Sequence, residues 1–269
     1  MSLKILAKLP KNLERYKMND IKITLLNHTP LWVCSNAIRT CYQSFEKGDK
    51  GGEKDKELIE RVGNKMRHAS TLEHLFYNFY IEGISRACLQ ELARHRIASL
   101  SVKSTRYTLK ELRVESPFVP LHGICDKNSP SASLDELSAL SAQGTGELLP
   151  HLPHTKTKAD FYGSDLAVRA KKYLVFTGDS MVDEFSILAL ENLRKVLAAG
   201  IKIDLAKYAL PESYKTALSW SINARSLQNF LSLRSSASAL WEIRNLANAL
   251  FAALPEEHKY LFKDSMAES

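Results

Sequence analysis

Residues 214–222 read YKTALSWSI and carry the clearest strand pattern in the chain. One set of residues, Tyr214, Thr216, Leu218, Trp220 and Ile222, alternates there with a second set, Lys215, Ala217, Ser219 and Ser221. A period of two is typical of a strand with one buried face. The next residues, 223–234 (NARSLQNFLSLR), predict a helix whose first turn Asn223 can cap. The sequence therefore predicts a strand that passes directly into a helix.

Further strands and helices are predicted on both sides of this segment. Residues 21–26 (IKITLL) and 74–81 (HLFYNFYI) indicate strands, and we expect Gly83 to end the second. Asp55 is expected to cap the first of several helices. Apolar residues at helical spacing predict these helices over 55–67, 85–96, 185–197, 203–209 and 240–254. With few strands and no regular alternation of strand and helix, the fold class is α+β.

Composition places the chain among ordinary globular proteins. It has 269 residues, of which 45% are hydrophobic and 25% charged, and this excludes a disordered, collagen-like or cysteine-stapled protein. No apolar run approaches the roughly 18–20 residues of a membrane span. The four cysteines form no CxxC pair, so we expect reduced thiols in a cytoplasmic protein. The net charge of +7 favours either an anionic partner or a basic solvated surface.

The domain prediction is a single domain over residues 20–266. Residues 1–19 are read as an N-terminal extension. Residues 125–163 are rich in Pro, Gly and Ser, so we read them as a surface insertion. Within it, His151 and His154 could form half of a metal site, but the prolines on either side favour a solvated loop. We therefore expect no metal site.

A dense basic run over residues 94–107 (RHRIASLSVKSTRY) is the first candidate binding site. Guanidinium groups bind phosphate oxygens in pairs, and the hydroxyls of this run can complete the shell. The chain has no GxGxxG or GxxxxGK[ST] motif, so any phosphate must be held by side chains. The alternative is a solvated basic turn.

Two other segments complement this run. In residues 223–234, Arg225 and Asn229 are four apart and share a helical face. Their guanidinium and amide groups suit the donor and acceptor edge of a planar heterocycle. Residues 68–74 (HASTLEH) place two histidines and a carboxylate beside a predicted strand. For His74, a structural role and a functional one both stay open. Together the three segments indicate a phosphorylated planar ligand.

The same three segments resemble the motifs of flavin-dependent thymidylate synthases. That family reads RHR, then a Ser three positions on, then a Ser and an Arg, which here are Arg94, His95, Arg96, Ser99, Ser104 and Arg106. Residues 68–74 resemble its His-x-Ser/Thr-x-x-Glu-His segment, and residues 223–234 resemble its third motif. The three motifs occur in the family's order, so the resemblance is specific.

The resemblance implies a fold and an activity. The fold is a roll with a small antiparallel sheet flanked by helices. The family methylates dUMP at uracil C5 to give dTMP. Methylenetetrahydrofolate supplies the one-carbon unit, and FAD reduced by NADPH supplies the hydride. Members are homotetramers with shared active sites, so the implied partners are small molecules and copies of the chain, with no nucleic acid and no membrane.

The resemblance also implies roles for individual residues. The catalytic ones are Arg234, whose charge would stabilise negative charge on uracil, and His68, near the flavin. FAD would be bound by Ser70, Glu73, Arg94, His95, Arg96, Val102, Asn223, Ala224, Arg225 and Asn229. The residues implied for dUMP are Glu91, Leu92, Ala93, Arg94, Val102, Lys103, Ser104, Thr105, Arg106, Lys207 and Arg234. The cysteines lie outside the basic segments, and this family needs no thiolate nucleophile.

Three positions depart from the family pattern. The family often has Asn, Glu and Arg where this chain has Ser101, Val102 and Lys207. Val102 can contribute only packing or backbone contacts, and Lys207 lacks the guanidinium fork. Two other functions stay open: a dUMP- or FAD-binding regulator with little turnover, and a nucleic-acid-binding module. Against the second, Tyr107 is the one aromatic residue within the basic run.

Overall fold

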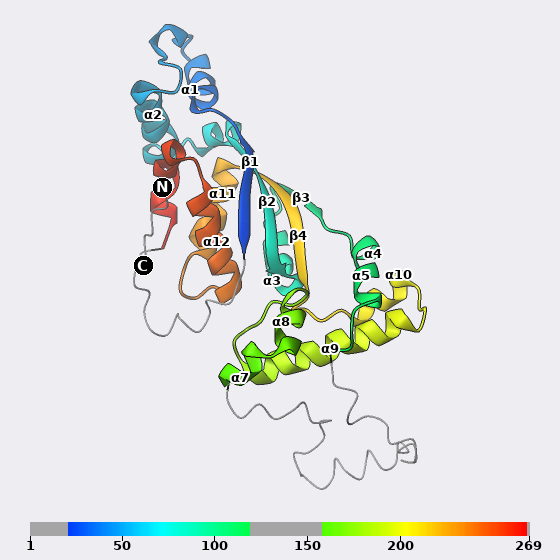
Figure 1. Ribbon diagram of the computed structural model, residues 1–269. Coiled ribbons are helices and arrows are strands. Elements are labelled where there is room, and N and C mark those ends of the chain that lie inside the picture. Colours follow the sequence, from blue (N-terminus) through cyan, green and yellow to red (C-terminus); the bar gives the residue numbers. More distant parts are fainter. Residues whose placement is uncertain (1–20, 119–157, 268–269) are drawn as a thin grey trace, which may run out of the picture. The chain divides into compact units, whose positions relative to one another are not determined.

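The computed structural model describes residues 21–118 and 158–267. The chain divides into two compact units, Met1–Lys103 with Glu212–Ser269, and Ser104–Pro211, which are described separately. The sheet belongs to the first unit, and the second is helical (Figure 1). Within the described residues, no helix has both the length and the apolar composition needed to cross a membrane. The predicted extension at 1–19 and most of the insertion predicted at 125–163 lie outside the described residues.

A four-stranded antiparallel sheet with the order β1-β2-β4-β3 forms the centre of the first unit. The strands are β1 (Lys22–His28), β2 (Phe76–Ser85), β3 (Ala98–Val102) and β4 (Lys215–Asn223). The predicted α+β class is confirmed, as are three predicted strands with slightly shifted ends. β3 was not predicted, because its residues lie inside the basic run and none of them is buried.

Gly83 does not end β2, so that prediction was wrong. Gly83 has a φ of 82°, a conformation that glycine adopts without steric cost. The register shifts between Glu82 and Ile84, and pairing with β4 then resumes at Thr216. The glycine therefore accommodates a bulge inside the strand.

The sheet is packed against helices that follow directly from its strands. β4 runs into α11 (Ala224–Arg234), whose predicted cap is confirmed: Asn223 Oδ1 accepts a hydrogen bond from Ser226 N at 2.8 Å. α11 and α12 lie side by side next to the strands in Figure 1. The other helices of this unit are α1 (Leu31–Thr40), η2 (Phe45–Lys47), α2 (Glu53–Ile59), η3 (Glu60–Lys65), η4 (Ala69–His74), α3 (Arg86–Ala93), α12 (Trp241–Ala253) and η6 (Glu256–Ser265).

Asp55 does not cap α2, contrary to the prediction. Gly52 occupies the N-cap position, and the Asp55 carboxylate is buried. Its Oδ1 lies 3.0 Å from Nη1 of buried Arg39, and its Oδ2 accepts a hydrogen bond from Gly51 N. A charge buried this deeply needs a charged partner. The residue therefore forms a long-range ion pair instead of a local cap.

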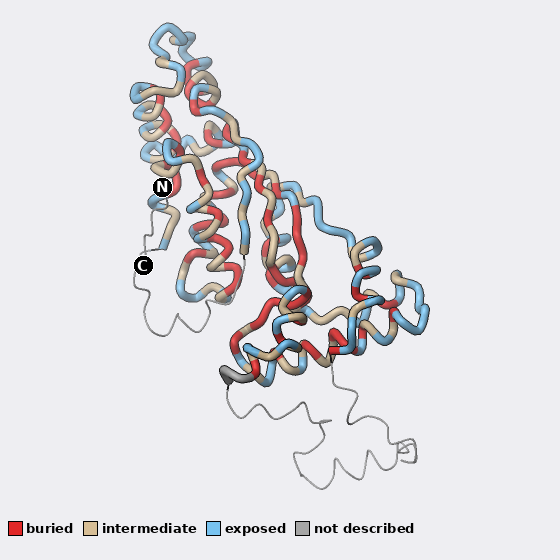
Figure 2. Tube along the Cα trace, viewed as in Figure 1, coloured by how far each residue is buried: buried red, intermediate tan, exposed pale blue. Residues whose placement is uncertain are grey.

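Aromatic residues fill the core of the first unit. Phe79 of β2 and Trp220 of β4 are cross-strand partners, and both are buried. The ring of Phe230, on α11, lies 5.2 Å from that of Trp220. Figure 2 shows buried residues along β2 and β4 and along the helices packed on them. This core holds α11 against β4.

The second unit is built around α9 (Ser180–Ala198). The predicted helix over 185–197 is confirmed and begins five residues earlier, because Asp179 Oδ1 accepts hydrogen bonds from Met181 N and Val182 N. The predicted helix over 203–209 consists of α10 and η5. The elements of this unit besides α9 are α4 (Thr105–Thr108), α5 (Lys110–Arg113), α7 (Lys158–Gly163), α8 (Asp165–Lys171), α10 (Ile203–Ala206) and η5 (Lys207–Ala209).

Replacing Asp183 by alanine is expected to lower the free energy of unfolding by about 2–5 kcal/mol. The buried Asp183 carboxylate accepts hydrogen bonds from Thr177 N at 2.7 Å, Gly178 N at 3.0 Å and the Tyr162 hydroxyl at 2.7 Å. Each buried donor left without an acceptor costs about 1–3 kcal/mol. Urea unfolding measures the loss. Asp165→Ala is the control, since Asp165 is exposed, and an equal loss in both variants would contradict the account.

Candidate functional site

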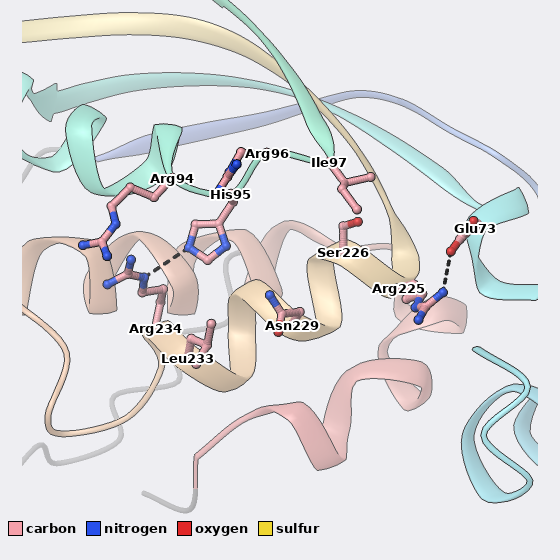
Figure 3. A pocket seen from close by; sticks show the side chains of 10 residues that line it. All are labelled: Glu73, Arg94, His95, Arg96, Ile97, Arg225, Ser226, Asn229, Leu233 and Arg234. Carbon is pink, nitrogen blue, oxygen red and sulfur yellow. Dashed lines mark hydrogen bonds and ion pairs between the residues drawn. The ribbon is translucent and has the colours of Figure 1, made fainter. Parts of the chain in front are cut away.

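A cavity of about 780 Å³ lies between α11 and the chain after α3 (Figure 3). All of its lining belongs to the first unit. It brings together seven residues that the sequence assigned to a site: Glu73, Arg94, His95, Arg96, Arg225, Asn229 and Arg234. Four of these carry guanidinium groups, so the cavity favours an anionic ligand.

Arg234 is fixed at one end of the cavity by two partners. Its Nε donates a hydrogen bond to His95 Nε2 at 3.1 Å, and its Nη1 lies 2.9 Å from Glu91 Oε2. Glu91 Oε1 also lies 3.5 Å from Arg94 Nη1. One carboxylate on α3 therefore holds two guanidinium groups at the same end of the cavity.

Arg225 is fixed at the other end. Its Nη1 donates a hydrogen bond to Glu73 Oε1 at 2.7 Å, and both side chains are labelled in Figure 3. Arg225 and Asn229 are on the same face of α11, as their spacing predicted. The amide of Asn229 lies between the two charged ends in this view. The cavity therefore has charge at both ends and an uncharged polar group between them.

His95 is held as a neutral imidazole. Burial and the charges of Arg234 and Arg94 lower its pKa, and Glu91 opposes them. Because Nε2 accepts the hydrogen bond from Arg234, the ring proton is on Nδ1. The ring packs edge-on against Phe230 at 4.9 Å. The core thus supports the residue that orients Arg234.

Stability is expected to fall below pH 6.5 more steeply in the wild type than in His95→Asn. The folded-state pKa of His95 lies below the value of about 6.5 expected in the unfolded chain. As the pH falls, the unfolded chain therefore binds the proton first. The contribution of His95 is complete above pH 6.5 and is lost as the pH falls through the folded-state pKa. Urea unfolding at several pH values measures both slopes, and equal slopes would contradict the neutral assignment.

Other predicted residues of the first unit lie outside the lining of this cavity. Leu92 and Ala224 are fully buried, so only their backbone atoms are available to contact a ligand. The Asn223 side chain is occupied as the cap of α11. His68 instead lines a second cavity, of about 980 Å³. The remaining predicted residues of this unit are exposed or half-buried: Ser70, Glu91, Ala93, Val102 and Lys103.

Four residues predicted for dUMP belong to the second unit: Ser104, Thr105, Arg106 and Lys207. Within that unit, Arg106 Nε lies 2.8 Å from Asp204 Oδ1. The Lys207 ammonium lies 5.6 Å from the centre of the Tyr208 ring. Both cations are therefore close to other groups of their own unit.

Three lining residues were missed by the sequence analysis: Ile97, Ser226 and Leu233. Ser226, Asn229 and Leu233 are spaced by three and then four residues, so their common face of α11 could have been read from the sequence. Ile97 and Leu233 are 74% and 56% exposed. They give the cavity apolar surface beside its charges.

The buried cysteines do not have the character of nucleophiles. Burial raises the pKa of the Cys34 thiol to about 12, and burial also raises the pKa of Cys88 far above its usual value. A nucleophilic cysteine needs a lowered pKa instead. Cys41 is exposed, and Cys125 lies outside the described residues.

Comparison with known families decides the membership of the chain. The model of the thymidylate synthase complementing protein family matches residues 24–258. The chain belongs to this family. The resemblance inferred from the three motifs is thereby confirmed.

Individual relatives in this family are similar over almost their whole length. The flavin-dependent thymidylate synthase of Campylobacter jejuni (strain RM1221) is 59% identical over 243 residues, which are 90% of this chain and 96% of that one. The Helicobacter pylori (strain 26695) enzyme is 52% identical over 247 residues, 91% and 99% of the two chains. A crystal structure of thymidylate synthase X from Helicobacter pylori with FAD and dUMP superposes with a TM-score of 0.72 at 51% identity, covering 92% and 100%. The α+β fold is thus that of the family.

Proposed function

We propose that this chain is a flavin-dependent thymidylate synthase that methylates dUMP to dTMP. Methylenetetrahydrofolate would supply the one-carbon unit, and NADPH would reduce the FAD. The observation that carries the proposal is the cavity in which the RHR segment meets α11. It collects four guanidinium groups around an amide, and this chemistry suits a phosphorylated planar ligand. Two relatives, 59% and 52% identical to this chain, are named flavin-dependent thymidylate synthases.

The donor set of the cavity fits FAD. Arg94, Arg96 and Arg225 offer charge-assisted hydrogen bonds to a pyrophosphate, and Asn229 offers both a donor and an acceptor to a ring edge. Ile97 and Leu233 supply the apolar surface against which a flat ring can lie. When bound, FAD supplies the hydride. We propose the implied FAD contacts of Ser70, Glu73, His95, Val102, Asn223 and Ala224 on the strength of the family motifs.

Arg234 is proposed to act on the uracil of dUMP. Its guanidinium is oriented before the substrate arrives, because Glu91 and His95 bind Nη1 and Nε. A fixed cation beside N3 and O4 stabilises the negative charge that develops there, and such preorganised groups cost no reorganisation during the reaction. His95 and Glu91 are positioning residues in this account.

The remaining substrate contacts are proposed from the motifs alone. Residues 91–94 and 102–106 would hold dUMP, with Ser104 and Arg106 on its phosphate and Lys207 nearby. His68 would lie near the flavin. We propose no role for nucleic acid.

We also propose that the chain forms homotetramers in the cytoplasm. Ile97 and Leu233 are largely exposed, and the bound flavin together with a second copy of the chain would cover this apolar surface. Light scattering after size-exclusion chromatography tests this assembly. A mass of one chain in the presence of FAD would contradict it.

The visible spectrum of the purified protein tests the cofactor part of the proposal. We expect flavin bands after incubation with FAD and gel filtration, and we expect NADPH to bleach them without oxygen. Arg225→Ala should retain less flavin, because it removes the guanidinium group at one end of the cavity. The control Arg244→Ala should retain as much as the wild type, since Arg244 donates to Ala237 O outside the cavity. A protein that takes up no FAD would overturn the proposal.

A further inference from the structure

A group of metal-ligating side chains lies outside both cavities. His28, Glu257 and His258 each offer one ligand atom, and these atoms all lie within 4.8 Å of one another. His28 is the last residue of β1, and the other two are in η6. None of the three lines the cavity at α11 or the cavity that contains His68. The proposed thymidylate chemistry therefore leaves this cluster unexplained.

The pairing of β1 with β2 and the packing of η6 bring the side chains of this cluster together. His28 pairs with Tyr77 across β1 and β2. The His258 ring packs against both of them, with its centre 5.0 Å from that of His28 and 5.7 Å from that of Tyr77. Tyr77 Oη lies 2.8 Å from His258 Nδ1. The buried ring of His258 is thus fixed through one nitrogen.

The hydrogen bond between Tyr77 and His258 resembles the contact that orients a metal-binding histidine. A histidine that binds a metal through one nitrogen usually donates the other N–H to an oxygen. Here Nδ1 can donate to Tyr77 Oη, and Nε2 is then the nitrogen left for a metal. His28 is half-buried and Glu257 is exposed, so an ion can enter from solvent.

We propose that His28, Glu257 and His258 bind one divalent transition-metal ion of the Zn²⁺ class. Two imidazoles and one carboxylate suit Zn²⁺, whereas Mg²⁺ and Ca²⁺ prefer oxygen ligands. Ligand atoms about 2.0–2.2 Å from zinc in a tetrahedron are about 3.4 Å apart. The three ligand atoms lie within 4.8 Å of one another, so the side chains move closer together when the ion binds. Water completes the coordination.

The bound ion would tie the end of β1 to η6 near the C-terminal end of the described chain. This role is structural and separate from the nucleotide cavity. It departs from the sequence-based expectation of no metal site. That expectation considered histidines close together in sequence, whereas this cluster joins residues at the two ends of the described chain.

Zinc binding by the full-length protein tests the proposal. After treatment with a chelator, the wild type is titrated with Zn²⁺ in competition with a chromophoric chelator. We expect one ion per chain. His28→Asn and Glu257→Gln should each weaken binding by at least about 10- to 100-fold, because each removes a ligand. These two positions are chosen because His258 is buried and its replacement could prevent folding.

Matched controls separate this site from zinc bound elsewhere. Glu256→Gln and His74→Asn change exposed residues that are not part of the cluster and should bind zinc as the wild type does. Co²⁺ should give the absorption of a four-coordinate site in the wild type and in Glu256→Gln but not in His28→Asn. The proposal is overturned if the wild type binds no zinc, or if the two cluster variants bind it as tightly as the wild type.

Discussion

Replacing Arg234 by alanine is expected to lower the rate of dTMP formation by about 100- to 1,000-fold. That is the usual effect of removing one preorganised group that stabilises charge in a transition state. The side chain is held by Glu91 at 2.9 Å and by His95 at 3.1 Å, so its position is fixed before the substrate binds. Product formation from saturating dUMP and methylenetetrahydrofolate, measured with saturating FAD and NADPH, gives the ratio of kcat values.

Two further variants separate the chemical role of Arg234 from a structural one. Arg234→Lys keeps the charge but replaces the planar guanidinium, whose donors have fixed directions, by a compact ammonium on a flexible chain, so it should recover only part of the rate. Arg244→Ala removes a guanidinium outside the cavity and should keep the wild-type kcat. An Arg234→Ala protein with an unchanged kcat would remove this residue from the catalytic role.

Replacing Phe230 by alanine is expected to lower the free energy of unfolding by about 3–5 kcal/mol, the usual cost of truncating a buried aromatic residue. Phe230 has no exposed surface, and its ring contacts those of Trp220 at 5.2 Å and His95 at 4.9 Å. The substitution leaves a void in the core and removes the ring against which His95 packs. We therefore also expect weaker FAD binding, measured by flavin fluorescence at a temperature where the variant is folded.

A smaller change at Phe230 and a truncation at an exposed phenylalanine test this link between the core and FAD binding. Phe230→Leu keeps most of the buried volume and should lose less stability and less FAD affinity. Phe45→Ala truncates an exposed phenylalanine and should change the free energy of unfolding by no more than about 0.5 kcal/mol. If Phe230→Ala lost stability but bound FAD as tightly as the wild type, the link would be refuted.

Local patterns in the sequence predicted the elements that carry strong signals of their own. The alternation over 214–222 and the capping side chain of Asn223 specify β4 and the start of α11 without help from distant residues. α1 was missed because it begins after Pro30 with no side-chain cap and no acidic residue in its first turn. Asp55 was assigned wrongly because its partner, Arg39, lies beyond the reach of a local pattern.

The site illustrates the same limit. Each of its segments could be recognised in the sequence, but their juxtaposition depends on the sheet. Glu73 and Arg225 are 152 residues apart, and His95 and Arg234 are 139 apart. Composition and spacing alone predict only that the ligand is anionic and planar. The resemblance to the family motifs supplies the predicted cofactor, substrate and reaction. The cluster at His28 and His258 matches no motif, so only the structure brings it into view.

Transfer of label from methylenetetrahydrofolate to dUMP is the most direct test of the central claim. The purified protein, loaded with FAD and reduced by NADPH without oxygen, is mixed with dUMP and folate labelled in its methylene carbon. The account predicts that the label is recovered in dTMP, and that omission of FAD or of NADPH abolishes the transfer. A protein that binds FAD and dUMP yet leaves all of the label in the folate would contradict it and would favour a nucleotide-binding regulator.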